Sequence, residues 1–299
     1  MKTRRWVIGI AGLVLVLWSV WQIQRAAQGL KTVRASSAGV PMVFLGPRQA
    51  MDGSRPLVLV GHGFAGSGTV MRGFAYTFAH AGYVVALWDF DGHGSNPNPM
   101  PANTAGGSLL PNAEAALAEA QRLGLADTRR LAILGHSMGS GVALTFGQQH
   151  AETAATIAVS PVGTSVTPDL PRNLLLMAGS LEPNFASSAQ KRLAEAGGSG
   201  GDPATGTGRK LLIIPNVEHI SILFSTQAHT TALEWLNATF GTQPEAAPYT
   251  DRRILWFGVS ILGTLLASAT LIRAHRLRLP EEGCPILCGG GAWRWRVVR

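Results

Sequence analysis

Residues 131–144 read LAILGHSMGSGVAL, an apolar strand pattern that runs directly into a helix pattern. The junction is G-x-S-x-G, with Gly135 and Gly139 placed two positions before and two positions after Ser137. A sharp strand-to-helix turn brings its backbone against neighbouring chain, so these flanking positions need small residues. The same turn lifts the serine Oγ clear of the sheet and puts a helix N-terminus beneath it. The stretch therefore predicts a nucleophilic serine. The alternative is a glycine-rich turn with an ordinary N-cap serine.

Short aliphatic runs alternate with helix-like segments through the middle of the chain. Continuous apolar runs of this kind are typical of strands that are buried on both faces of a sheet. Strands are predicted at 42–45, 57–60, 83–88, 131–134, 156–159, 174–177 and 211–214, and helices at 70–80, 113–123, 138–149, 186–195 and 225–240. The alternation predicts an α/β fold with a doubly wound, mostly parallel sheet over residues 40–241. The small or polar stretches 35–40, 197–208 and 243–249 are interpreted as linkers or loops.

Two long apolar runs flank this region. The first is Trp6–Val20, and the second is Ile254–Ile272, which contains no charged residue. Nineteen helical residues cover about 28 Å, close to the hydrocarbon thickness of a bilayer. The runs predict an N-terminal transmembrane anchor or signal-anchor within residues 1–24 and a second transmembrane helix at 254–272. A cleaved signal peptide is the alternative for the first run, and a buried core helix is the alternative for the second.

The basic charge of the chain lies outside the predicted sheet. The formal net charge is +8, but residues 40–250 hold 11 Lys and Arg against 14 Asp and Glu. The excess therefore brackets the two apolar runs, as expected beside anionic headgroups. No basic stripe with interleaved aromatics occurs in the middle region, so nucleic acid is not an expected partner. The charge distribution slightly favours both termini in the cytoplasm, with the middle domain on the other side of the membrane.

A nucleophilic serine requires a histidine base, which in this type of fold comes late in the chain. His219 follows the last predicted strand in LLIIPNVEHISIL, so its imidazole is expected at the same edge of the sheet as Ser137. His229 lies in the final predicted helix and is the weaker choice. His136, beside the serine, is interpreted as a packing group rather than a base.

The acid that orients the histidine is expected between the serine and the histidine. Glu182 follows the strand LLLM at its carboxyl end and is the preferred candidate. Asp169, one connection earlier, is the alternative. Glu218 is adjacent to His219 in sequence, which normally directs its carboxylate away.

The stretch 57–68, LVLVGHGFAGSG, also contains G-x-G-x-x-G after a predicted strand. Such a loop could hold the pyrophosphate of a dinucleotide, with Asp89 or Asp91 on the ribose. Beside a nucleophilic serine it would instead supply one donor of an oxyanion hole. The candidate donors are the backbone N–H groups of Phe64 and Met138.

The motifs HGFAGSG, WDFDGHGSNP, GHSMGSG, LLLMAGSLEP and IPNVEHISIL follow one another in the order found in α/β-hydrolases. The chain resembles bacterial membrane-anchored members of that superfamily that are grouped with dienelactone hydrolases. True dienelactone hydrolases use a cysteine nucleophile where this chain has Ser137, so the resemblance does not imply lactone specificity. The resemblance implies a serine hydrolase of the bacterial inner membrane that cleaves carboxylic esters or thioesters. The charge distribution slightly favours the periplasmic side for its domain. The resemblance also implies small-molecule or lipid-like acyl substrates. Hydrolysis of this type requires no cofactor and no metal.

Two other functions are compatible with these motifs: a catalytically silent binding module at the membrane and an NAD(P)-dependent oxidoreductase. The connection between the strands at 156–159 and 174–177 is short, which predicts a site without a large lid. Residues 273–299 form a basic, tryptophan-bearing tail whose Cys284 and Cys288 are a weak indication of a metal site.

Overall fold

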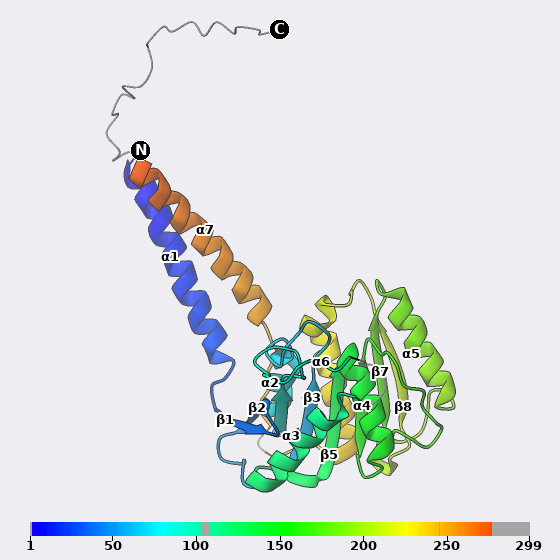
Figure 1. The fold of residues 1–299 in the computed structure, drawn as a ribbon. Helices are drawn as coiled ribbons and strands as arrows, with labels where there is room; N and C mark the ends of the chain where they lie inside the picture. The colour runs from blue at the N-terminus through cyan, green and yellow to red at the C-terminus, as the bar shows by residue number, and fades with distance from the viewer. Residues whose placement is uncertain (1, 103–107, 245, 277–299) are drawn as a thin grey trace, which may run out of the picture. The chain divides into compact units, whose positions relative to one another are not determined.

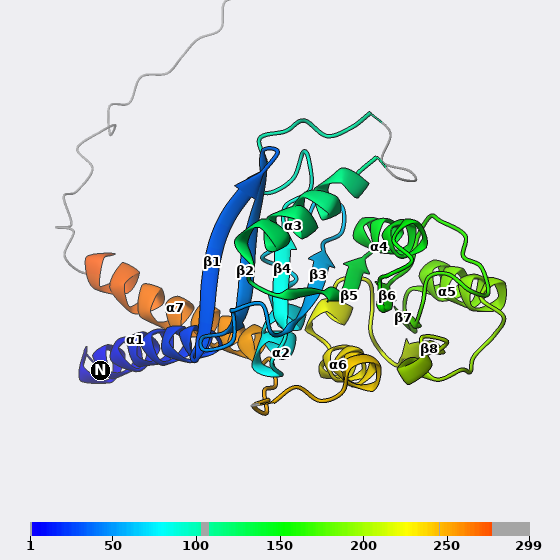
Figure 2. The ribbon, with the colours of Figure 1, turned by 90° about the horizontal axis from the view of Figure 1, so that it is seen from below.

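The computed structural model describes residues 2–102, 108–244 and 246–276. Residues 24–254 form one compact unit, and the described parts of the chain outside these limits form a second. The larger unit contains an eight-stranded sheet with helices on both faces (Figures 1 and 2). Its strands are β1 (Leu30–Ser37), β2 (Val40–Pro47), β3 (Pro56–Gly61), β4 (Val84–Trp88), β5 (Asp127–His136), β6 (Ala155–Val159), β7 (Leu174–Gly179) and β8 (Arg209–Ile214). Its helices are α2 (Arg72–His80), α3 (Leu110–Leu123), α4 (Met138–Gln149), α5 (Pro183–Glu195) and α6 (Thr226–Phe240), with short 3₁₀ turns η1 (Pro203–Thr205) and η2 (Ser221–Phe224).

Six of the eight strands, from β4 to β8 in the order of the sheet, are parallel to one another. The strand order is β1-β2-β4-β3-β5-β6-β7-β8, and only the β1–β2 and β2–β4 pairs are antiparallel. The parallel strands therefore end at one common edge of the sheet, where α/β proteins place their ligands. Gly61 of β3 pairs with Gly135 of β5, so the loops that follow these two strands begin side by side.

Helices cover the sheet in two layers. In Figure 2, α2 and α6 lie on one face, and α3, α4 and α5 lie on the other. Successive residues of β3 alternate between these layers: Val58 and Val60 join the core under α2 and α6, while Leu57 and Leu59 join the core under α3 and α4. All four are fully buried, which is the physical reason for the continuous apolar run in the sequence.

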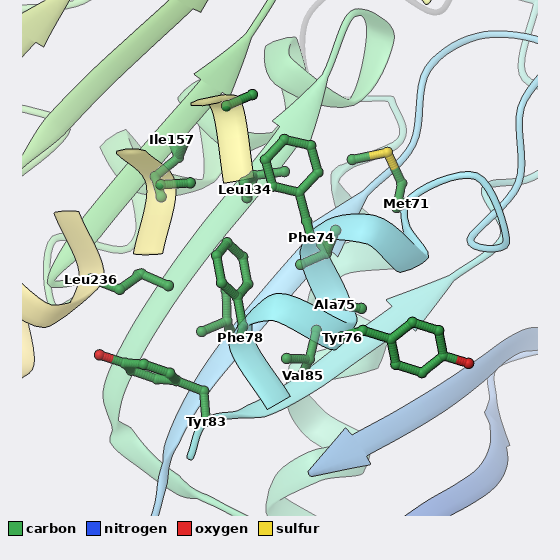
Figure 3. Close-up of a cluster of buried hydrophobic side chains, with 14 of the residues drawn as sticks. Met71, Phe74, Ala75, Tyr76, Phe78, Tyr83, Val85, Leu134, Ile157 and Leu236 are labelled. Atoms are coloured by element: carbon green, nitrogen blue, oxygen red, sulfur yellow. The ribbon is translucent and has the colours of Figure 1, made fainter. Parts of the chain in front are cut away.

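The core beneath α2 is built on aromatic rings. Phe74 and Phe78 project from α2 toward Leu134 and Ile157 of the sheet and Leu236 of α6 (Figure 3). Both phenyl rings are fully buried, with 6.1 Å between their centroids. This packing fixes α2, which follows the glycine loop after β3.

The structure confirms the predicted α/β fold class and each of the predicted strands and helices, with shifts of a few residues at their ends. The interpretation of residues 35–40 as a linker is wrong, because β1 extends to Ser37 and β2 begins at Val40. Strand β1 is an edge strand with an alternating, largely exposed burial pattern, so it lacks an apolar run. The turn between the strands is Ala38-Gly39, both at positive φ, which is typical of a two-residue hairpin.

Helices α1 (Lys2–Arg25) and α7 (Arg253–Arg276) contain the two apolar runs. Segments of 20 residues in each are long and apolar enough to cross a membrane, and only 11% and 6% of them is buried. A core helix would be mostly buried, so this exposure argues against that alternative. The two helices approach closely at their glycines: a Cβ on Gly12 would lie 2.6 Å from the carbonyl oxygen of Gly263. Residues 277–299 of the predicted tail, with Cys284 and Cys288, lie outside the described residues.

We predict that Phe78→Ala lowers the free energy of unfolding by about 3–5 kcal/mol, because it removes a fully buried ring and leaves a cavity. Phe64→Ala is the matched control, since the Phe64 side chain is 66% exposed, and its effect should stay within about 0.5 kcal/mol. Denaturant unfolding of the full chain, followed by tryptophan fluorescence, measures both. Equal losses at the two positions would contradict the placement of Phe78 in the core.

Candidate active site

Ser137 lies on the turn between β5 and α4 with a strained backbone. Its φ of 51° and ψ of −119° lie in a region that residues with a side chain rarely adopt. The turn depends on its two glycines. A Cβ on Gly135 would collide with the carbonyl group of Gly139, and a Cβ on Gly139 would lie 2.5 Å from the carbonyl oxygen of His62. The G-x-S-x-G spacing is therefore a steric requirement of this fold.

A chain of hydrogen bonds joins three side chains that the sequence analysis selected. The Oγ of Ser137 lies 3.0 Å from Nε2 of His219, and Nδ1 of His219 lies 2.8 Å from Oε2 of Glu182. With Nδ1–H donating to the carboxylate, Nε2 has a free lone pair that accepts the serine hydroxyl. An arrangement of this kind can deprotonate a serine as the hydroxyl attacks and can stabilise the resulting imidazolium.

The Glu182 carboxylate is held from its other side. Its Oε1 accepts hydrogen bonds from Ser160 Oγ at 2.8 Å and from the backbone N–H of Gly179 at 2.6 Å. Glu182 is 5% exposed and occupies the N-cap position of α5, where the positive end of the helix dipole favours a negative charge. These contacts fix the orientation of Oε2 toward His219.

The His219 imidazole contacts two other rings. The phenyl ring of Phe185 stacks on it with 4.2 Å between centroids and 19° between planes, and the His136 ring lies 4.7 Å away. His136 Nε2–H also donates to the backbone carbonyl of His219 at 2.9 Å. The ring and the backbone of His219 are thus both restrained.

Two buried histidines beside the site are neutral at neutral pH. Burial, followed by the neighbouring His219, lowers the pKa of His136 to about 4. Burial likewise lowers the pKa of His62 to about 4. The His62 ring accepts from the Phe90 N–H through Nε2 at 3.0 Å, so its Nδ1–H donates to the Gly63 carbonyl at 2.7 Å. Neither ring therefore carries a charge that would oppose an imidazolium at His219.

The glycine loop after β3 lies against the serine. A Cβ on Gly63 would lie 3.2 Å from Cβ of Ser137, so this loop approaches the turn as closely as glycine permits. The N–H of Phe64, the next residue, donates no hydrogen bond to any described residue. Met138 is the first residue of α4, where a backbone N–H has no acceptor within the helix. Both groups are free to bind an anion.

The alternatives weighed from the sequence lie elsewhere. Asp169 is near Arg209, and among the described residues Glu182 is the carboxylate bonded to His219. Glu218 accepts from the backbone N–H groups that open η2. His229 is buried, with Nε2 bonded to the carbonyl of Leu223.

Comparisons with known proteins agree with this architecture. The profile of a family described as serine aminopeptidase, S33, matches residues 52–200. The chain belongs to the α/β-hydrolase superfamily. A search of curated proteins finds no match to this α/β-hydrolase.

Solved structures share the fold of this α/β-hydrolase at low sequence identity. A bacterial membrane phospholipase A has a TM-score of 0.52 and 14% identity, over 77% of this chain and 92% of that one. A dienelactone hydrolase described as putative, from Klebsiella pneumoniae, has a TM-score of 0.52 and 16% identity, over 72% and 99%. An esterase from Pyrococcus furiosus has a TM-score of 0.50 and 15% identity, over 73% and 94%.

The sequence analysis missed two residues that touch the hydrogen-bonded chain. Ser160 comes directly after the apolar run of β6, at the edge where the other site residues lie, so its position was a usable signal. Phe185 had no such signal, because its contact with His219 depends on where α5 begins.

We predict that the stability of this α/β-hydrolase falls as pH drops from about 6.5 toward 4. The folded pKa of His136 lies below its ordinary value of 6.5, so the unfolded chain takes up the proton first and acid favours unfolding. The expected loss is about 1.4 kcal/mol per pH unit for each such histidine.

The variant His136→Gln tests this assignment, because glutamine keeps an N–H donor but does not titrate. Denaturant unfolding of both proteins at several pH values between about 7.5 and 4.5 measures the slope. The free energy of unfolding of the variant should depend less steeply on pH, by the amount that corresponds to the uptake of about one proton on unfolding. An unchanged slope would contradict a neutral, buried His136.

Proposed function

We propose that the chain is a membrane-anchored serine hydrolase that cleaves carboxylic esters or thioesters through an acyl-enzyme intermediate. The observation that carries this proposal is the hydrogen-bonded chain from Ser137 through His219 to Glu182, at the edge where the parallel strands end. The descriptions of two structural neighbours, an esterase and a phospholipase, are consistent with ester cleavage.

In the first half of the reaction, Ser137 Oγ attacks the substrate carbonyl carbon and its proton passes to Nε2 of His219. Glu182 stabilises the imidazolium through the Nδ1–H bond. The backbone N–H groups of Phe64 and Met138 bind the oxyanion of the tetrahedral intermediate. When the intermediate collapses, the bond to the alcohol or thiol breaks, and the leaving group takes the proton from His219.

In the second half, water attacks the acyl-serine. His219 removes a proton from the water as it adds to the carbonyl carbon, and the same two N–H groups bind the second oxyanion. Collapse of this intermediate releases the carboxylic acid and returns the proton to Ser137. Each half reaction ends with His219 neutral, with its proton on Nδ1 and a free lone pair on Nε2.

Helices α1 and α7 are proposed to anchor the hydrolase domain in a membrane. Their candidate spans, Trp6–Arg25 and Arg253–Ile272, are apolar and largely exposed, and basic residues flank both. We place both termini in the cytoplasm and the domain on the periplasmic side of a bacterial inner membrane, which the charge distribution slightly favours.

We predict that Ser137→Ala lowers kcat on 4-nitrophenyl butyrate by a factor of about 10⁴ or more, because no nucleophile remains. The wild-type chain should also be labelled at Ser137 by a fluorophosphonate, and the variant should not. Mass spectrometry identifies the labelled residue. A folded wild-type chain that neither turns over esters nor takes up the label would favour the binding-module alternative.

We predict that Glu182→Gln lowers kcat by a factor of about 10²–10⁴, because a neutral amide no longer fixes the tautomer or stabilises the imidazolium. Glu218→Gln is the matched control, since Glu218 is next to His219 in sequence but bonds to backbone N–H groups of η2. Its kcat should stay close to that of wild type, because the Glu218 carboxylate bonds to backbone N–H groups and not to the His219 ring. Similar losses in the two variants would argue against Glu182 as the orienting acid.

A further inference from the structure

Exposed apolar side chains of the hydrolase domain lie next in sequence to residues of the proposed active site. In the part of the sequence that separates α1 from α7, the described residues include three exposed large hydrophobic side chains. They are Phe64, Leu181 and Ile220, which are 66%, 61% and 55% exposed. Single exposed apolar residues are ordinary on a protein surface, but a group of them at one place marks a binding surface.

Each of these residues adjoins a member of the site. Leu181 precedes Glu182, Ile220 follows His219, and Phe64 follows the glycine that packs against Ser137. The three side chains therefore come from the loops after β7, β8 and β3, which meet at the same edge of the sheet.

The loops that carry Leu181 and Ile220 are bonded to each other. The N–H of Leu181 donates to the carbonyl of Val217 at 3.0 Å, and the N–H of Asn216 donates to Ser180 Oγ at 2.9 Å. On the third side, the Phe64 ring packs edge-on against His93 with 5.4 Å between centroids. The apolar side chains are thus presented from fixed backbone and not from free loop tips.

Charge limits what such a surface can bind. The loop segments 62–68, 180–182 and 215–220 contain no Lys or Arg, and their charged residues are Glu182 and Glu218. An anionic group bound there would find no counter-charge from these loops and would meet the Glu218 carboxylate. A protein partner bound over the three side chains would cover Ser137, whereas an apolar chain attached to the reacting carbonyl would not.

We infer that Phe64, Leu181 and Ile220 form an apolar rim that binds the hydrocarbon chain of the substrate, which is an uncharged ester with a long acyl group. This inference rests on the proposed function, because the rim matters only if Ser137 attacks an ester. It narrows the substrate class from esters and thioesters in general to neutral, lipid-like acyl esters. Anionic thioesters are poor substrates on this basis.

The test compares 4-nitrophenyl acetate with 4-nitrophenyl octanoate, using the full chain in lipid nanodiscs and each ester below its micelle concentration. A fully buried methylene is worth about fourfold in kcat/KM. The octanoate, which lies along the rim, should therefore exceed the acetate by about tenfold or more. The double variant Leu181→Ser with Ile220→Ser should lose about tenfold on octanoate and stay within about twofold of wild type on acetate.

The apolar double variant Leu181→Met with Ile220→Leu is the matched control and should keep the wild-type preference. Wild-type turnover that is independent of chain length would overturn the inference but leave the proposed function standing. The same is true if the double variant Leu181→Ser with Ile220→Ser loses activity by the same factor on acetate and on octanoate. A wild-type chain inactive on both esters and not labelled at Ser137 would overturn the proposed function, and the inference with it.

A second comparison tests the charge of the chain. 4-Nitrophenyl hemisuccinate matches the butyrate in length but ends in a carboxylate, so it should have the lower kcat/KM. Equal or faster turnover of the hemisuccinate would overturn the assignment of uncharged substrates.

Discussion

The backbone turn at Ser137 is the constraint on which the site depends. A residue with a side chain is held at positive φ between β5 and α4, and the strain persists because the surrounding sheet and helix fix both ends of the turn. Gly135 and Gly139 allow the two elements to meet there, since a Cβ at either position would collide with backbone. The same approach brings the glycine loop after β3 against the serine. The glycine-flanked turn thus sets the position of the Ser137 hydroxyl and of the backbone N–H groups beside it.

Much of the fold could be predicted because the parallel strands are buried on both faces. Strands β3 to β8 appear as continuous apolar runs, and each helix on the sheet has a distinct amphipathic or apolar stretch between them. Strand β1 could not be found in this way, since it lies at the sheet edge with its side chains largely exposed. The turn that joins it to β2 was a weak signal too, because Ala38 stands where such turns usually have Asn, Asp or Gly.

The candidate site was predictable to the extent that chain order and strand ends determine it. Ser137, Glu182 and His219 each follow a recognisable strand, so their meeting at one edge follows from the parallel topology. The contacts that restrain them have a different origin. Phe185 reaches His219 because α5 starts immediately after Glu182, and His136 reaches the His219 carbonyl across the turn. Such contacts depend on loop geometry that no periodicity encodes.

Glu182 and Phe185 share the first turn of α5, which couples the reach of the acid side chain to the position of the stacking ring. Pro183 begins the helix directly after the carboxylate, so the acid and the stacked ring belong to one rigid segment. An aspartate is shorter by one methylene, and bringing it to His219 would require the start of α5 to shift toward the imidazole. Such a shift would press Phe185 into a ring that already lies 4.2 Å away. In this chain, the length of the acid side chain and the size of the residue that stacks on His219 are therefore not independent.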